Sequence, residues 1–129
     1  MTLKYRLVNY LILAVAVVFL LFCLRVGLMQ AEKLKQSELV AANAQVLQAG
    51  MRFFYNDYDR FPKASEFQSD GSLVAYFSAF PPKAFISQKC QESFLYQRPT
   101  LTSFELAFCL EKAVGGFNRG WNKIINSGN

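Results

Sequence analysis

At 129 residues, of which 53% are hydrophobic, the chain has room for one small domain once its most apolar stretch is set aside. The chain has 14 Lys and Arg against 9 Asp and Glu, and these basic residues are spread along the sequence. Nucleic-acid-binding proteins usually have a clustered basic patch, so we do not expect nucleic acid as a partner. Histidine, the commonest general base and metal ligand, is absent. No serine, cysteine or lysine has an identifiable base beside it, and we expect no enzymatic activity, cofactor, metal or small-molecule substrate.

An uncharged apolar run from Leu7 to Leu24 dominates the N-terminal part. It has 18 residues, and 13 of them are Leu, Ile, Val or Phe. At about −0.4 kcal/mol each, these 13 favour the bilayer by about −5 kcal/mol, and at ~1.5 Å per residue the helix would span about 27 Å of the roughly 30 Å hydrocarbon core. The run predicts a single membrane-spanning helix. Because Lys4 and Arg6 precede it, we expect a cytoplasmic N-terminus and an extracytoplasmic C-terminal domain.

A cleaved signal peptide is the alternative, since it shares the basic start and the apolar stretch. Its apolar region is usually about 7–15 residues long and is followed by an A-x-A-like cleavage site. The segment from Val26 to Ala31 contains no such site. A buried helix of a soluble protein is disfavoured, because the remaining chain of about 100 residues could hardly cover a helix that is apolar all round.

The helical pattern continues past the apolar run, and no proline occurs before Pro62. Apolar residues at intervals of three and four predict one helix face that packs on the rest of the protein: Val40, Ala44, Leu47, Met51 and Phe54. The helix must end by Phe61, because proline disfavours a helical conformation at the preceding residue. We therefore divide the chain into an anchor (1–25), the extramembrane half of the helix (26–60) and a small head (61–129).

The head carries one clear strand pattern. In the segment from Ser103 to Glu111 every second residue is large and apolar, which predicts a buried strand face: Phe104, Leu106, Phe108 and Leu110. We expect Ser93 to Arg98 to pair with it across a turn at 99–102. Residues 121–125 predict a last short strand or a packed tail. The expected fold is α+β, a long N-terminal helix whose first half spans the membrane and whose C-terminal half carries a small antiparallel sheet.

Two cysteines flank the predicted hairpin. Cys90 and Cys109 have 18 residues between them, and in an exported domain this predicts a disulfide. Two reduced, buried cysteines are the alternative. Cys23 lies in the anchor, where the simplest interpretation is a lipid-facing side chain.

Four acidic residues gather near the end of the predicted helix: Asp57, Asp59, Glu66 and Asp70. Their spacing lacks the full calcium-loop pattern, and Arg60 and Lys63 are close enough to neutralise them. We interpret them as a polar rim or helix-end turn, rather than a metal site.

The residues from Phe53 to Pro62, FFYNDYDRFP, resemble the end of the first helix in type IV pilin-like proteins and type II secretion pseudopilins. The segment Ser103 to Glu111, followed by glycines at 115, 116 and 120, is similar to the strand and glycine-rich ending of small pilin-like proteins. The resemblance implies a long helix, half in the membrane, with a small sheet over its C-terminal half. It also implies a minor or diverged structural subunit of a type IV pilus or type II secretion-like machine, with other pilin-like subunits as partners.

The start of the apolar run departs from that family. Thr2 to Arg6 contain no glycine at which a prepilin peptidase would cleave, and the run holds no equivalent of the family's glutamate. We therefore do not expect pilin-type processing there. A second function stays open, namely a stand-alone extracytoplasmic binding or sensor module, anchored in the membrane, that does not polymerise.

Overall fold

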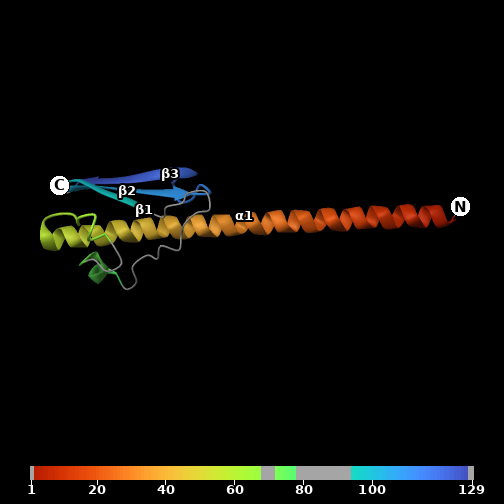
Figure 1. Cartoon of the computed structure of the whole chain (residues 1–129), viewed down its shortest axis with the longest axis horizontal. Helices are drawn as coiled ribbons and strands as arrows, with labels where there is room; N and C mark the ends of the chain where they lie inside the picture. Colours follow the sequence, from red (N-terminus) through yellow and green to blue (C-terminus); the bar gives the residue numbers. More distant parts are fainter. Residues whose placement is uncertain (1, 68–71, 78–93, 128–129) are drawn as a thin grey trace. The chain divides into compact units, whose positions relative to one another are not determined.

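The computed structural model describes residues 2–67, 72–77 and 94–127. One long helix and a three-stranded antiparallel sheet make up most of it (Figure 1), and the predicted α+β fold is confirmed. In chain order the elements are α1 (Thr2–Tyr58), the 3-10 helix η1 (Ser72–Tyr76), β1 (Phe94–Thr100), β2 (Ser103–Leu110) and β3 (Gly120–Ser127). The chain forms two compact units, Met1–Lys33 and Leu34–Asn129, so the later part of α1 belongs to the same unit as the sheet.

Helix α1 ends at Tyr58, within the limit that Pro62 sets. Asp59 follows in the left-handed conformation, with φ of 51°, and its backbone N–H donates to the carbonyl oxygen of Tyr55 at 2.8 Å. Among residues other than glycine, aspartate and asparagine adopt this conformation most readily. The aspartate therefore closes the helix and turns the chain towards Phe61.

Strand β2 is the central strand of the sheet, whose order is β1-β2-β3. Phe108 of β2 pairs with Phe94 on one side and with Asn122 on the other. Strand β1 continues to Thr100, two residues beyond the expected end, so the turn is shorter than the sequence predicted. Pro99 fits inside β1 because this strand lies at an edge of the described sheet, and the register shifts between Gln97 and Thr100.

The hydrophobic core lies between α1 and β2, and Figure 1 shows the sheet alongside the C-terminal part of the helix. Every residue of the two predicted faces is at most 4% exposed, and all belong to one cluster: Val40, Ala44, Leu47, Met51 and Phe54 of α1, with Phe104, Leu106, Phe108 and Leu110 of β2. Ser37 adds a polar contact, since its buried hydroxyl accepts a hydrogen bond from the backbone N–H of Lys112 at 3.0 Å. Residues 121–125 lie within β3, which decides between the strand and the packed tail.

Gly50 interrupts the good helix formers of α1 for a steric reason. A Cβ atom at this position would lie 2.6 Å from Cε1 and 2.9 Å from Cε2 of Phe77, so the phenylalanine ring packs directly on the helix backbone. These distances are too short for a real Cβ contact. Glycine lets the segment after η1 approach the helix.

We expect Gly50→Ala to destabilise the C-terminal unit. Overpacking costs about 1–3 kcal/mol and outweighs a gain in helix propensity of up to about 1 kcal/mol. Urea unfolding followed by circular dichroism should give a lower midpoint, and Phe77→Leu in the same chain should restore part of the loss. Gly27→Ala is the control, because a Cβ atom at Gly27 would have no heavy atom within 4 Å. Equal midpoints for Gly50→Ala and the wild type would contradict the packing of Phe77 on the helix backbone.

Candidate interaction surfaces

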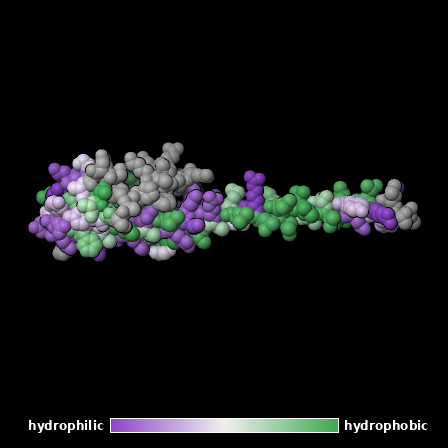
Figure 2. All heavy atoms as spheres, turned by 90° about the horizontal axis from the view of Figure 1, so that it is seen from below, coloured by the Kyte–Doolittle hydropathy of each residue, from purple (hydrophilic) through white to green (hydrophobic). Residues whose placement is uncertain are grey.

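The first surface is the apolar part of the N-terminal unit. Between Leu7 and Leu24 the large hydrophobic side chains are 49–69% exposed, and none of the most hydrophobic window of α1 is buried. Figure 2 shows hydrophobic surface over this segment, with hydrophilic atoms near its N-terminal end. A core helix of a soluble protein would be covered. The protein thus has a helix long and apolar enough to cross a membrane, near its N-terminus.

Cys23 lies in this segment with a free, exposed thiol. Exposed apolar side chains continue beyond Arg25, at Val26, Leu28 and Met29. The exposed apolar surface is therefore longer than the uncharged run.

The second feature is an ion pair just after α1. The Arg60 guanidinium donates two parallel hydrogen bonds to the Glu66 carboxylate, at 2.8 and 2.9 Å. The backbone N–H of Lys63 donates to the same carboxylate at 2.6 Å, and the Ser72 hydroxyl donates at 3.3 Å. The Arg60 guanidinium also lies over the ring of Phe54, 5.2 Å from its centroid. These contacts fix the chain as it leaves the helix.

The other two described acids near the helix end, Asp57 and Asp59, have separate structural roles. Asp57 accepts a hydrogen bond from the Tyr76 hydroxyl at 2.6 Å, and this bond raises the pKa of Tyr76 to about 12. Asp59 forms the left-handed turn, and Asp70 lies outside the described residues. Within residues 2–67, 72–77 and 94–127, no group of three His, Cys, Asp or Glu side chains could hold a metal ion.

The helix end is also joined to the β1–β2 hairpin. The Phe61 backbone N–H donates to the carbonyl oxygen of Leu101 at 2.8 Å, and Arg98 donates to the Phe61 carbonyl at 3.0 Å. The Tyr96 hydroxyl donates to the Pro62 carbonyl at 2.7 Å. Burial raises the pKa of Tyr96, so its hydroxyl keeps the proton that it donates. These hydrogen bonds join the segment just after α1 to the β1–β2 hairpin.

The Arg60–Glu66 pair predicts a loss of stability in acid. The hydrogen bond from Arg60 lowers the pKa of Glu66 from its ordinary 4.5 to about 2 in the folded protein. Because the folded-state pKa is the lower one, the stabilisation is fully present above pH 4.5 and is lost as the pH falls towards 2. The carboxylate is partly exposed, so we expect about 1–2 kcal/mol at full ionisation.

The test is urea denaturation of the wild type and of Glu66→Gln at pH 7, 4 and 2.5. The difference between their free energies of unfolding isolates the contribution of Glu66 from that of the other carboxylates. The wild type should be the more stable at pH 7, and the difference should shrink towards pH 2.5. A difference that stays constant over this range would show that the ion pair contributes no pH-dependent stability.

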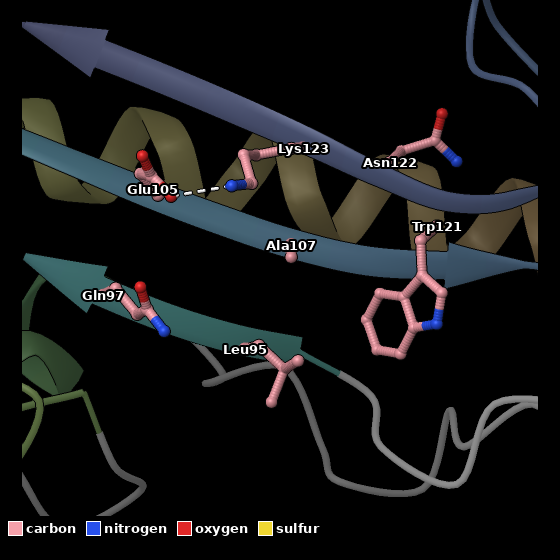
Figure 3. Close-up of a pocket in the computed structure, with 7 residues that line it drawn as sticks. All are labelled: Leu95, Gln97, Glu105, Ala107, Trp121, Asn122 and Lys123. Atoms are coloured by element: carbon pink, nitrogen blue, oxygen red, sulfur yellow. Dashed lines mark hydrogen bonds and ion pairs between the residues drawn. The ribbon is translucent and has the colours of Figure 1, made fainter.

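The second surface is a hollow on the face of the sheet opposite the helix (Figure 3). Its floor is Ala107 of β2, whose neighbours in register are Leu95 of β1 and Lys123 of β3. Leu95 and Trp121 flank this floor, and the hollow measures about 410 Å³. The Trp121 side chain is 54% exposed. A large aromatic ring therefore borders a concave, solvent-accessible surface.

Polar side chains form the rim of the hollow. The Lys123 ammonium and the Glu105 carboxylate are paired at 2.8 Å, and the Gln97 amide lies across the floor on β1. Asn122 of β3 also lines the hollow, but its side chain points away from Ala107 (Figure 3) and bonds to the backbone of Asn118 and Gly120.

This hollow was not predicted from the sequence, where the strand pattern drew attention only to the phenylalanine-bearing face of β2. Glu105 and Ala107 alternate with those phenylalanines, and this alternation is the signal that places them on the opposite face. The signal identifies the face but not the concavity.

Only one cysteine of the predicted Cys90–Cys109 disulfide lies within the described residues. Cys109 is a buried residue of β2, 5% exposed, whereas Cys90 lies outside the described residues. The pairing stays a prediction. Closing this loop would contribute about 3 kcal/mol. Intact mass after thiol alkylation in denaturant without reductant should show one modified cysteine, Cys23, and three modified cysteines would contradict the bond.

No family model, curated protein or solved structure matches the chain. Function is therefore inferred from the chemistry and placement of the chain's own residues. The resemblance of residues 53–62 to the helix end of pilin-like proteins contributes only as a motif in the sequence.

Proposed function

We propose that the protein is a noncatalytic, single-pass membrane subunit of a pilin-like assembly, a minor or diverged component of a type IV pilus or type II secretion-like machine. The exposed apolar segment from Leu7 to Leu24 carries the proposal, because it lies in the same helix whose later residues form the core of the C-terminal unit. A helix with this division of surfaces can hold a small head at a membrane. The aromatic end of α1 adds the resemblance to pilin-like proteins.

The proposed orientation places the N-terminus in the cytoplasm and the C-terminal unit outside. Lys4 and Arg6 precede the apolar segment, and basic residues on the cytoplasmic side favour this insertion. In this arrangement the anchors of neighbouring subunits meet in the bilayer, where helices associate through packing rather than through the hydrophobic effect. The disulfide, if formed, would stabilise the extracytoplasmic head.

The test is photo-cross-linking in the native membrane. A photoreactive amino acid at Leu13, which is exposed in the anchor, should yield adducts with other single-span proteins that share a pilin-like start. The same group at Leu47 is the control, because that side chain is buried in the core and should yield no adducts with other proteins. Adducts with lipid alone at Leu13 would count against assembly.

The second candidate is a membrane-anchored binding or sensor module that does not polymerise. The departure at residues 2–6, which lack a glycine, favours it, as does the hollow bordered by Trp121. Intact mass of the purified protein separates the two functions. A mature N-terminus at Met1 supports the module, whereas a trimmed and methylated N-terminus supports the pilus or secretion subunit.

A further inference from the structure

We propose that the hollow on the outer face of the sheet binds a neutral sugar ring, which stacks on Trp121 and bonds to the polar rim. Such binding is independent of whether the protein assembles. The starting point is the indole, because a tryptophan left more than half exposed is typical of binding surfaces, where its apolar face and N–H are both used.

The size and position of the hollow favour a compact ligand. Its volume of about 410 Å³ falls within the roughly 300–1,000 Å³ of small-molecule pockets. The floor exists because Ala107 is small, whereas Glu105 on the same face of β2 is long. An extended peptide would instead pair with the backbone at a sheet edge. The hollow lies over the central strand and is lined by side chains of all three strands, so a ring that inserts between side chains fits it better.

The charges of the rim residues favour an uncharged ligand. Lys123 and Glu105 form an ion pair at 2.8 Å, so their formal charges cancel, and an ionic ligand would have to break this pair. Gln97 adds an amide that can both donate and accept. Hydroxyl groups also donate and accept, and therefore match a rim that offers both.

A sugar ring combines the two properties that the hollow requires. Its C–H groups form an apolar face that can lie against the indole of Trp121 and the side chain of Leu95, and its hydroxyls point outward from the ring edge. Neither a purely apolar molecule nor an anion would use both the aromatic wall and the neutral polar rim. A neutral saccharide is the class of ligand that we infer.

The experiment uses the single tryptophan of the chain, so any change in tryptophan fluorescence comes from Trp121. The full chain, in a detergent without a sugar headgroup, is titrated with tetrasaccharides of N-acetylglucosamine, β-1,4-linked glucose and α-1,4-linked glucose. At least one should shift the emission to shorter wavelength and saturate, with a dissociation constant of about 1 mM or below. Isothermal calorimetry should give the same constant.

Two substitutions locate the site. Ala107→Leu fills the floor on the solvent side of the sheet and should weaken binding about tenfold or more, while leaving the circular dichroism spectrum unchanged. Gln97→Ala, which removes a rim amide, should weaken it as well and guards against misfolding of the first variant. Ile125→Ala is the matched control, because Ile125 is exposed on the same sheet but does not line the hollow. It should bind as the wild type does.

Three results would overturn the proposal. The first is the absence of a saturable shift with all three oligosaccharides up to about 10 mM, where even weak sites fill. The second is undiminished binding by both Ala107→Leu and Gln97→Ala. The third is an emission shift that depends on protein concentration and not on sugar, which would identify the hollow as a contact between copies of the chain.

Discussion

Replacing Phe104 with alanine is expected to lower the free energy of unfolding of the C-terminal unit by about 3–5 kcal/mol. The Phe104 side chain is fully buried in the middle of the core, and its ring packs edge-on against Phe61 with the centroids 4.7 Å apart. Removing it leaves a cavity between β2 and the helix end. A domain of this size has about 5–15 kcal/mol in total, so this one change removes a large share.

Urea unfolding monitored by circular dichroism measures the loss. Phe53→Ala is the control, because Phe53 lies on the same helix as the core face but is largely exposed, and its loss should change the free energy by about 0.5 kcal/mol at most. If both substitutions cost the same, the core does not lie where the helix face and β2 meet.

Two aspartates in the apolar segment are expected to abolish membrane insertion. Val15 and Val18 are both exposed in the N-terminal unit, and each Val→Asp change costs about 3–4 kcal/mol near the middle of a membrane helix. Together they exceed the roughly 5 kcal/mol by which the 13 Leu, Ile, Val and Phe residues favour the bilayer. The doubly substituted protein should leave the membrane fraction on alkaline extraction.

Val15→Leu with Val18→Leu is the matched control, since it changes the same two positions without adding charge and should stay in the membrane. Retention of the double aspartate protein after alkaline extraction would show that the segment is not held by burial in lipid.

The fold was predictable from the sequence where apolar residues recur at a regular spacing and where a proline limits the length of a helix. Spacings of three and four from Val40 to Phe54 indicated the buried helix face, and Pro62 set the limit for the end of α1. The alternation at Phe104 to Leu110 indicated a strand with one buried face. These signals are local, because each depends only on which side of one element meets the core.

Other features depend on contacts between distant parts of the chain and leave no local pattern. Gly50 alone does not reveal that Phe77 packs on it. The sequence placed Arg60 close enough to neutralise the acids near the helix end, but not which acid it pairs with. The left-handed turn at Asp59 and the inclusion of Pro99 in β1 likewise depend on the neighbouring strand and loop. Tertiary packing therefore decided what the sequence left open.

The candidate site illustrates the same limit. Trp121 could be assigned to a strand or a tail, but its exposure depends on the register that pairs it with Cys109. The hollow needs three strands aligned so that the small Ala107 lies between larger neighbours. No single strand pattern carries that information.

The central claim is that the segment from Leu7 to Leu24 stays in the bilayer as part of the mature protein. Intact mass of the protein recovered from alkali-washed native membranes tests it most directly. We predict that the protein remains in the washed membranes with this segment attached. Release into the alkaline supernatant, or a mass that lacks these residues, would contradict the account.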